Sequence, residues 1–474
     1  MNIDFPQVIR RKAPEVLAPA GKLDTLKTAI DFGADAVYLG GREFGMRANA
    51  KNFTLDDIDA GLAYARARGA RVFVTVNVLP TSDEVDSLNN YMATLNEIGV
   101  DALIVSDIGV LMSARKVAPD TEIHISTQAG ITNYQAANAF VELGASRVVL
   151  ARELDLAAIR QIRANVPQHV EIEAFVHGAM CMAFSGRCLI SQHTTGRDAN
   201  HGDCAQSCRW KYHVVEEKRP GQFFPVEVTD EGTFLFNSQD MNTLEHVDEI
   251  IDAGVTSLKI EGRAKSAFYV ATVANAYKTA VNEYMIQRGF EDANGTQLKP
   301  FIDPVTAQRE NLADVGAIQP RENLADVGVT QPRENLADVG ATQPRVVLPE
   351  WLKQEPYKVA HREYSTGFYY PENPASEHIQ SGGSINEWRW VGVATGYDSE
   401  AGRVYLLAKN KIAPGAHVEF LFPNHEPVVL IAPADGILDD EGNPVAEINH
   451  NSRIFSIPCP EPIPAGAMVR VKMR

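Results

Sequence analysis

The sequence lacks the features of secreted, membrane-spanning and nucleic-acid-coating proteins. No apolar run is long enough to span a bilayer. The N-terminal residues include basic side chains but no apolar core, so we expect no secretory signal. Lys and Arg number 44 against 61 Asp and Glu, and the net charge of −17 gives no general attraction to phosphate backbones. We therefore expect a cytoplasmic protein with reduced thiols and no membrane partner.

Cysteine is scarce except in one segment. Four of the five cysteines follow the spacing C-x6-C-x15-C-x3-C, and Cys459 lies far along the chain. Disulfides need an oxidising compartment, and structural zinc sites usually have tighter first pairs than this one. An iron–sulfur cluster also takes four thiolates and tolerates more varied spacing. The residues alone favour an iron–sulfur cluster over zinc, with buried structural thiols as a further alternative. The candidate ligands are Cys181, Cys188, Cys204 and Cys208.

The first 290 residues repeat one unit, in which a helix ends at glycine and a short apolar strand follows. Strands that are apolar on both faces are typical of parallel sheets covered by helices. Eight such units predict an α/β fold, a (β/α)8 barrel of the TIM type. An open doubly wound sheet is the alternative, although no G-x-G-x-x-G turn follows the first strand. The predicted strands are 15–19, 35–40, 71–78, 101–106, 121–127, 146–151, 170–177 and 256–261.

Polar side chains follow these strands at the edge where a barrel carries its active site. A lone Asp or Asn there is often a helix cap, and Lys259 and Glu261 have the alternative of an ion pair inside the barrel. Because several of these side chains should meet at one mouth, we expect a functional site there. The candidates are Asn77, Ser106, Asp107, Thr127, Gln128, Arg152, Glu153, His177, Lys259, Glu261 and Arg263.

The cysteine segment leaves the end of the seventh strand, so we expect it to cover the barrel mouth. The excursion 178–255 is then an insertion into the barrel domain 1–290, and 223–237 alternates like a hairpin. The segment is also locally basic, with an ordinary solvated loop as the alternative. Its basic residues are Arg187, Arg197, Arg209 and Lys211, interleaved with His193, His201 and His213.

A linker is predicted at 291–345, before a C-terminal domain at 346–474. The linker holds three near-perfect 12-residue copies at 309–344, each with one Pro, one Gly and few large apolar residues. We interpret them as an expanded linker, with a partner-docking module as the alternative. Short strands between Gly and Pro predict a small β-barrel after 346. The segment 361–371 is interpreted as an interdomain packing patch, with base stacking by its aromatic residues as the alternative.

Several segments resemble the collagenase-like peptidase family U32, and within it the branch of tRNA-hydroxylating proteins. The resemblance covers about 15–285 and the β-rich tail, and the repeats are not part of it. It rests on LAPAG at 17–21, GADAVYLGG at 33–41, EAFVHGAMC at 173–181, SGRCLIS at 185–191, NSQDMNTLEHV at 237–247, SLKIEGRAKS at 257–266 and HREYSTGF at 361–368.

The resemblance implies conversion of wobble uridine in certain tRNAs to 5-hydroxyuridine, by a route that depends on prephenate rather than dioxygen. It also implies a 4Fe–4S cluster, whose ligands carry over onto the four clustered cysteines. The family's older label is peptidase. No G-x-S-x-G elbow and no H-E-x-x-H helix supports that label, and a thiolate bound to iron is not free to attack a peptide. A peptidase and a non-enzymatic RNA- or protein-binding scaffold are the alternatives.

On this hypothesis the candidate residues divide by their chemistry. Arg152, Arg263 and Lys259 suit a dicarboxylate such as prephenate. Acidic and imidazole side chains would move protons, polar strand-end residues would contact the substrate, and basic residues beside the cysteines would meet anticodon-loop phosphates. The proton carriers are Glu153, Glu261 and His177, the strand-end contacts are Asn77, Asp107 and Gln128, and the phosphate contacts are Arg187, Arg197 and Arg209.

Overall fold

The structure is a computed structural model of the whole chain. The predicted linker 291–345 and hairpin 223–237 lie almost entirely outside the described part, so their boundaries and roles stay predictions. The described residues are 13–44, 52–181, 183–186, 188–210, 239–290, 344–372, 384–448 and 452–473.

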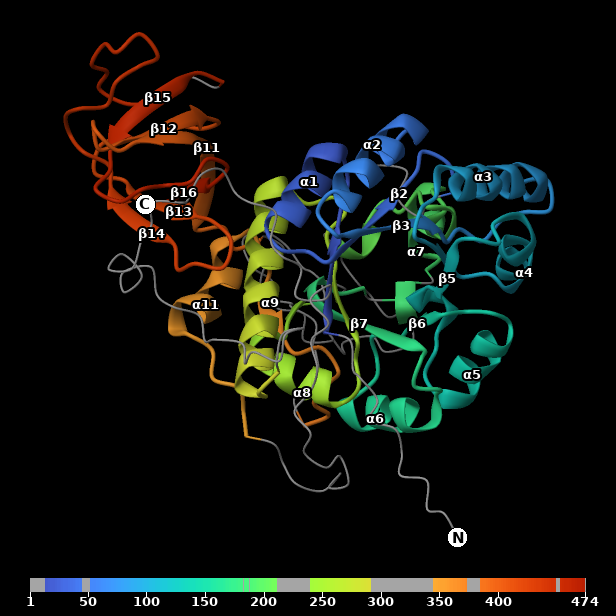
Figure 1. Cartoon of the computed structure of the whole chain (residues 1–474). Helices are drawn as coiled ribbons and strands as arrows, with labels where there is room; N and C mark the ends of the chain where they lie inside the picture. Colours follow the sequence, from blue (N-terminus) through green and yellow to red (C-terminus); the bar gives the residue numbers. More distant parts are fainter. Residues whose placement is uncertain are drawn as a thin grey trace, which may run out of the picture.

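All eight predicted strands are present, and they close into a parallel barrel (Figure 1). Each strand pairs with the next, and the last strand pairs with both β7 and β1, which completes the ring. The predicted (β/α)8 fold is therefore confirmed. Its strands are β1 (Glu15–Pro19), β2 (Ala36–Gly40), β3 (Arg71–Val76), β4 (Ala102–Val105), β5 (Glu122–Ile125), β6 (Arg147–Val149), β7 (Glu171–Ala179) and β9 (Ser257–Ile260).

Helices cover the outside of the barrel, and local signals in the sequence set their ends. The Thr54 hydroxyl accepts from the Asp57 amide, and the Asp57 carboxylate accepts from the Thr54 amide, which makes a capping box. Gly99 ends α3 in the left-handed conformation. Among the helices that the structure describes, none combines the length and apolar character needed to cross a bilayer. The helices that follow the barrel strands are α1 (Leu23–Asp31), α2 (Leu55–Arg66), α3 (Val85–Ile98), α4 (Ile108–Val117), α5 (Tyr134–Glu142), α6 (Leu156–Asn165), α8 (Val247–Asp252) and α9 (Ala267–Gln287).

Helix α9 differs from the others because it is buried on nearly every side. It packs on β1 and α1 of the barrel and on the short helices α11 (Glu350–Gln354) and η6 (Glu355–Lys358) that precede the C-terminal domain. Figure 1 shows it standing between the two domains. Asn275 accepts from the Asn424 amide at 2.9 Å, so α9 also contacts the C-terminal domain.

The C-terminal domain is a curled antiparallel sheet around its own apolar core. Behind it, Arg470 is fully buried and donates to Glu355 and Glu419, which joins the sheet to η6. The strand order is β14-β13-β16-β11-β12-β15. The strands are β11 (Trp388–Asp398), β12 (Arg403–Ala408), β13 (His417–Leu421), β14 (Val428–Ile431), β15 (Ile454–Pro458) and β16 (Met468–Lys472).

The segment 361–371 packs against the barrel, one of the two domains between which the packing-patch interpretation places it. Its strand β10 (Tyr364–Ser365) pairs with β8 (Asp240–Asn242), which pairs with the end of β7. Arg362 forms a buried ion pair with Asp240 at 2.6 Å. Its side chains therefore support the barrel wall beside β7.

Candidate functional site

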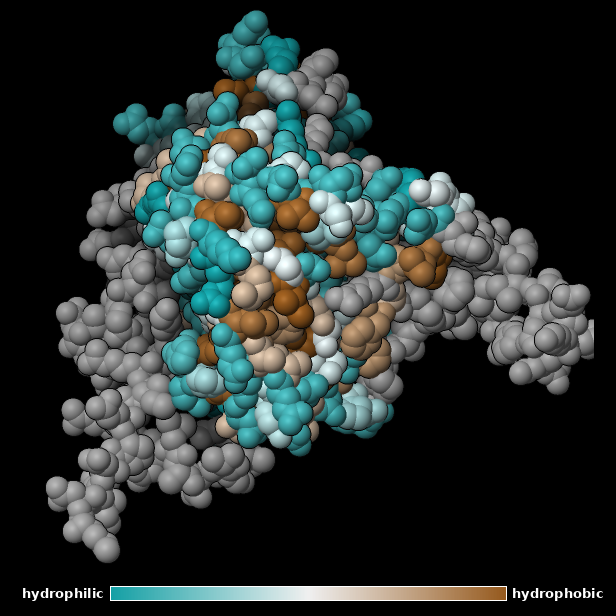
Figure 2. All heavy atoms as spheres, turned by 90° about the vertical axis from the view of Figure 1, so that its right-hand side faces the viewer, coloured by the Kyte–Doolittle hydropathy of each residue, from teal (hydrophilic) through white to brown (hydrophobic). Residues whose placement is uncertain are grey.

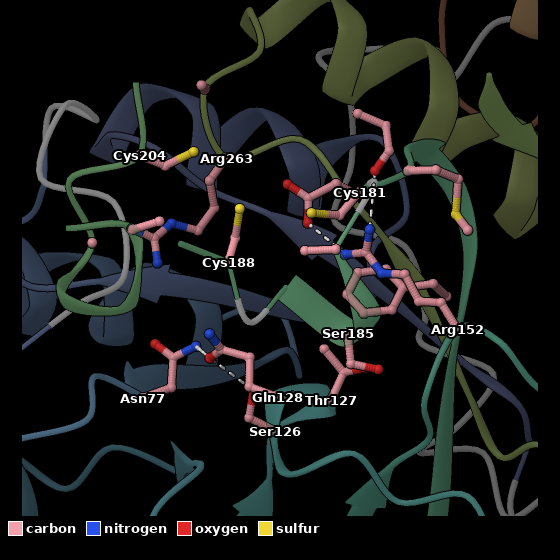
Figure 3. A pocket seen from close by; sticks show the side chains of 18 of the residues that line it. Asn77, Ser126, Thr127, Gln128, Arg152, Cys181, Ser185, Cys188, Cys204 and Arg263 are labelled. Atoms are coloured by element: carbon pink, nitrogen blue, oxygen red, sulfur yellow. Dashed lines mark hydrogen bonds and ion pairs between the residues drawn. The ribbon is translucent and has the colours of Figure 1, made fainter. Parts of the chain in front are cut away.

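A cavity of about 480 Å³ lies at the C-terminal ends of the barrel strands. The strand ends contribute polar and charged side chains, and the segment after β7 contributes the four clustered cysteines, none of which forms a disulfide. In Figure 3 the sulfur atoms of Cys181, Cys188 and Cys204 point towards the same opening. The predicted meeting of the cysteine segment with the strand ends is thus present in the structure.

The four thiols are not placed as a single tetrahedral zinc ion would hold them. A tetrahedral zinc site with Zn–S bonds of ~2.3 Å holds its sulfur atoms about 3.8 Å apart. Within the described residues, no three of the four sulfur atoms lie within 4.8 Å of one another. Four thiolates around one cavity are also the ligand set that an iron–sulfur group takes, and that cofactor stays a prediction. Cys181, Cys188, Cys204 and Cys208 are the residues that would hold it.

Two ion pairs lie inside the barrel, next to the cavity. Lys259 lines the cavity and donates to Glu173 at 2.5 Å, with both side chains buried. Burial alone would raise the pKa of Glu173, but the charges of Lys259 and Arg147 hold that pKa below its ordinary value. Glu261 pairs instead with Arg152 at 3.3 Å. Lys259 and Glu261 are therefore both in charge pairs, but not with each other.

Arg152 is held flat at the cavity wall. Its guanidinium lies 3.7 Å from the centre of the Phe175 ring, and it donates to the Ala179 carbonyl at 3.0 Å. Stacking on one face leaves the edge of the guanidinium for planar acceptors. A carboxylate of a ligand could take the place that Glu261 occupies.

Arg263 enters the mouth from the loop after β9. It donates to Thr75 at 2.9 Å and is buried. Two glycines make room for it, because a Cβ at Gly40 would lie 2.6 Å from its guanidinium and one at Gly21 would lie 2.1 Å from its carbonyl oxygen. This close approach is a physical reason for glycine at the ends of the first two strand motifs.

The floor of the cavity holds an amide pair. Asn77, after β3, donates to the Gln128 side chain at 2.6 Å, and Gln128 lies in the short helix η1 (Thr127–Ala129) after β5. Figure 3 shows the ends of the two side chains turned towards each other. Both residues line the cavity, as predicted for substrate contacts.

His177 does not belong to the cavity, against its predicted catalytic role. It is buried among Tyr269, Tyr277 and Tyr364, and burial lowers its pKa to about 3. The pairing of β7 with β9 shifts its register after Phe175, so His177 stands opposite the outward-facing Ile260. The bulge reverses the alternation that would have turned His177 inward. Its neutral imidazole is a weak base at physiological pH.

Glu153 and Asp107 also have structural partners. Both oxygens of Glu153 accept from Ser185, one from its amide at 2.8 Å and one from its hydroxyl at 2.9 Å. Glu153 therefore supports the cysteine segment and is not a lining residue that could move substrate protons. Asp107 caps α4 by accepting from the Val110 amide at 3.0 Å, as a helix cap does, and it lies outside the lining.

The predicted phosphate-binding arginines are only partly described. Arg187 lies outside the described residues, and so does the side chain of Arg209. Arg197 is about one-third exposed and pairs with Asp203 at 2.6 Å, away from the cavity lining. Their contact with RNA phosphates stays a prediction.

Sequence patterns missed three residues that shape the site. Glu173 forms an ion pair with Lys259, Thr75 holds Arg263, and Ser185 ties the cysteine segment to the strand ends. A signal existed for Glu173, since a charged residue inside an otherwise apolar strand needs a buried partner. Thr75 and Ser185 carry no such signal.

Two family models match the chain. The model of peptidase family U32 matches residues 21–308, and that of the U32 C-terminal domain matches 386–470. The chain is 33% identical to tRNA hydroxylation protein P1 of Bacillus subtilis, over 99% of this chain and 97% of that protein. It is 38% identical to a 23S rRNA 5-hydroxycytidine synthase of Escherichia coli, over 62% of this chain and 43% of that protein. It is 35% identical to a collagenase of Porphyromonas gingivalis, over 59% of this chain and 68% of that protein.

Proposed function

This chain belongs to peptidase family U32, and we propose that within this family it is an enzyme that hydroxylates RNA. The observation that carries the proposal is the convergence of four cysteine side chains, none in a disulfide, on a cation-lined cavity at the barrel mouth. The similarity to a tRNA hydroxylation protein extends over nearly the whole of both chains, and an rRNA hydroxycytidine synthase is a second relative. The first name describes hydroxylation of tRNA, and the second describes synthesis of 5-hydroxycytidine in rRNA.

The finer proposal is hydroxylation of wobble uridine at C5, with prephenate as the small-molecule partner. The lining contains Arg152, Lys259, Lys265 and Arg263 but, among acidic residues, only Glu261 within the described part. An excess of cations favours an anionic ligand such as a dicarboxylate. The anticodon loop suits such a mouth because its unpaired bases can leave the stack.

The roles of the residues follow from their positions. Arg152 would bind a ligand carboxylate in the plane that Phe175 fixes, while Lys259, held by Glu173, would supply a second charge. Gln128, fixed by Asn77, would donate to a carbonyl or carboxylate oxygen. Glu261 is the cavity carboxylate that could accept a proton, since His177 faces away. A 4Fe–4S cluster on the four thiolates would supply electrons or Lewis acidity beside the substrate.

A peptidase is the second candidate, because one relative is a collagenase. A cysteine peptidase needs a base within hydrogen-bond reach of its thiol. No histidine lines the cavity among the described residues, and His177 is turned into the protein. The described side chains thus supply no base for a cysteine peptidase. Purified chain without iron should leave gelatin and casein intact.

Nucleoside mass spectrometry of bulk tRNA from a deletion strain tests the proposed function. We expect 5-hydroxyuridine to disappear, and to return with the wild-type chain or with Cys459→Ser, whose thiol lies in the apolar core of the C-terminal domain. Complementation with Cys181→Ser should fail. Unchanged wobble hydroxylation in a strain without a parallel pathway would contradict the proposal.

A further inference from the structure

Two adjacent residues after β6 hold the turn that carries Cys181 and Cys188. Arg152 donates to the carbonyl of Ala179, two positions before the first of these cysteines, at 3.0 Å. Glu153 accepts from Ser185, three positions before the second, through both carboxylate oxygens. The turn is thus fixed at its entry and near its exit by one dipeptide of the barrel.

Ser185 is an unusual point of attachment. It is 3% exposed and has a φ of 45°, a left-handed conformation that costs about 1 kcal/mol or more for a residue other than glycine. A backbone held there needs compensating contacts, and the Glu153 carboxylate supplies two. Charged acceptors make hydrogen bonds roughly twice as strong as neutral ones. Glu153 is therefore the main described contact that keeps the turn in this form.

The neighbouring residue adds a packing contact on the same side. The Phe184 ring lies close to Gly130, since a Cβ on that glycine would be only 3.3 Å from the ring. The short helix η2 (Phe184–Gly186) therefore packs on the end of η1. Phe184 is half exposed and cannot by itself hold the turn. The ends of β5 and β6 together form the support beneath the segment between the first two cysteines.

We propose that Glu153 is a positioning residue for the metal site, which sets the separation of the Cys181 and Cys188 thiolates through Ser185. This inference rests on the proposed cluster, and it assigns Glu153 a function other than proton transfer. Residues that orient metal ligands typically change metal affinity by about 10–100-fold when they are removed. Glu153 would act without touching the substrate or the cluster.

The experiment compares Glu153→Ala with Asp155→Ala in the full chain. Asp155 is a matched control, because its carboxylate also accepts a backbone amide, that of Ala158 at 2.7 Å, but caps α6 instead of holding the cysteine turn. Both variants should fold, as judged by circular dichroism of the metal-free chain. After anaerobic reconstitution with iron and sulfide, we expect the cluster in Glu153→Ala to be lost to a chelator at least tenfold faster, measured by its charge-transfer absorbance. Asp155→Ala should match the wild type.

Two milder variants should give intermediate rates of cluster loss. Glu153→Gln keeps an oxygen that can accept from the Ser185 amide, so the loss should be smaller than with alanine. Ser185→Gly removes the hydroxyl contact but relieves the left-handed strain, so it should also fall between the wild type and Glu153→Ala. Wild-type cluster stability in Glu153→Ala would overturn the proposal. Equal loss in Glu153→Ala and Asp155→Ala would also overturn it, because general destabilisation would then explain the result.

A thiol measurement separates this proposal from the cluster itself. In the metal-free chain, alkylation of the half-buried Cys188 by iodoacetamide should be several-fold faster in Glu153→Ala, while the exposed Cys204 should react as in the wild type. If the wild type takes up no iron and sulfide, the proposed cofactor fails, and faster alkylation of Cys188 would still show that Glu153 holds the turn. Unchanged Cys188 reactivity would then reject Glu153 as the holding residue.

Discussion

The two ends of the barrel interior use the same charged residue types in opposite ways. At the N-terminal end, Arg147 is fully buried and donates to Glu15 at 2.7 Å, to Glu173 at 2.8 Å and to Glu171. At the C-terminal end, Arg152 borders a cavity and shares its charge with Glu261. Arg147 and its partners fill the N-terminal end of the barrel interior, whereas Arg152 faces a cavity that a ligand can fill.

The pKa values at the N-terminal end of the barrel interior show how strongly its charged groups interact. Burial alone would raise the pKa of Glu15, but the Arg147 and Arg71 guanidinium groups hold that pKa well below its ordinary value. His124 has a lowered pKa, because it is buried and lies near Arg147. The difference teaches that buried charge in this barrel is not by itself a sign of function. An adjoining cavity is what distinguishes the mouth.

The largest expected effect is on the free energy of unfolding, from a change at the N-terminal end of the barrel interior. Arg147→Met would leave Glu15 buried without its main partner and would remove one of the two cations that pair with Glu173, and removal of one member of a buried ion network costs about 3–5 kcal/mol. Chemical denaturation should show this loss. Lys411→Met, which breaks the surface pair with Glu447, should cost at most about 1 kcal/mol. Equal losses in the two variants would contradict the distinction between the network and a surface pair.

The next effect is on ligand binding at the mouth. Arg152→Lys keeps the charge but loses the planar stacking on Phe175, and we expect prephenate to bind about tenfold more weakly. Calorimetric titration measures this change. Arg66→Lys on the outer surface, where Arg66 donates to the Gly99 carbonyl, is the control and should bind as the wild type does. An unchanged dissociation constant in Arg152→Lys would remove Arg152 from the ligand site.

The third prediction concerns His177 and pH. The unfolded chain binds a proton on this imidazole below its ordinary pKa of 6.5, while the folded chain does so only below about 3. Acidification therefore favours unfolding between these values, by about 2 kcal/mol from pH 7 to pH 5. Urea unfolding of His177→Asn should lack this part of the pH dependence. Parallel pH profiles for the wild type and the variant would show that His177 is not held neutral.

The smallest effect is expected at Asp107. Asp107→Ala removes the cap of α4 and should lower stability by about 1 kcal/mol. Prephenate affinity should not change, because Asp107 is not part of the cavity lining. Thermal unfolding and titration of the same sample check both statements. A large loss of affinity with little change in stability would return Asp107 to the substrate site.

The strands were predictable because each one carries its own signal. A glycine such as Gly99 ends the preceding helix, and the apolar run after it has the length of a strand. The position of the cysteine segment followed from the fold, since a loop after the seventh strand must leave at the mouth. Local chemistry and barrel topology were enough for these features.

Side-chain direction was harder to predict where the backbone departs from regular geometry. The register shift after Phe175 turns His177 outward, and its mark in EAFVHGA is Gly178, a glycine inside a strand pattern, which does not say which side chains turn. The Glu153–Ser185 contact joins residues 32 positions apart, and Arg147 meets Glu15 across 132 positions. Such contacts depend on how the whole barrel closes. Figure 2, which faces the side of the barrel, likewise shows apolar side chains among hydrophilic ones at the surface, a mixture that periodicity alone does not resolve.

The most direct measurement of the central claim is the iron and sulfide content of the full chain purified without oxygen. We predict about four iron and four sulfide per chain, lost in Ser variants of Cys181, Cys188, Cys204 and Cys208 and retained in Cys459→Ser. One zinc per chain, or iron retained after replacement of the four clustered cysteines, would contradict the account.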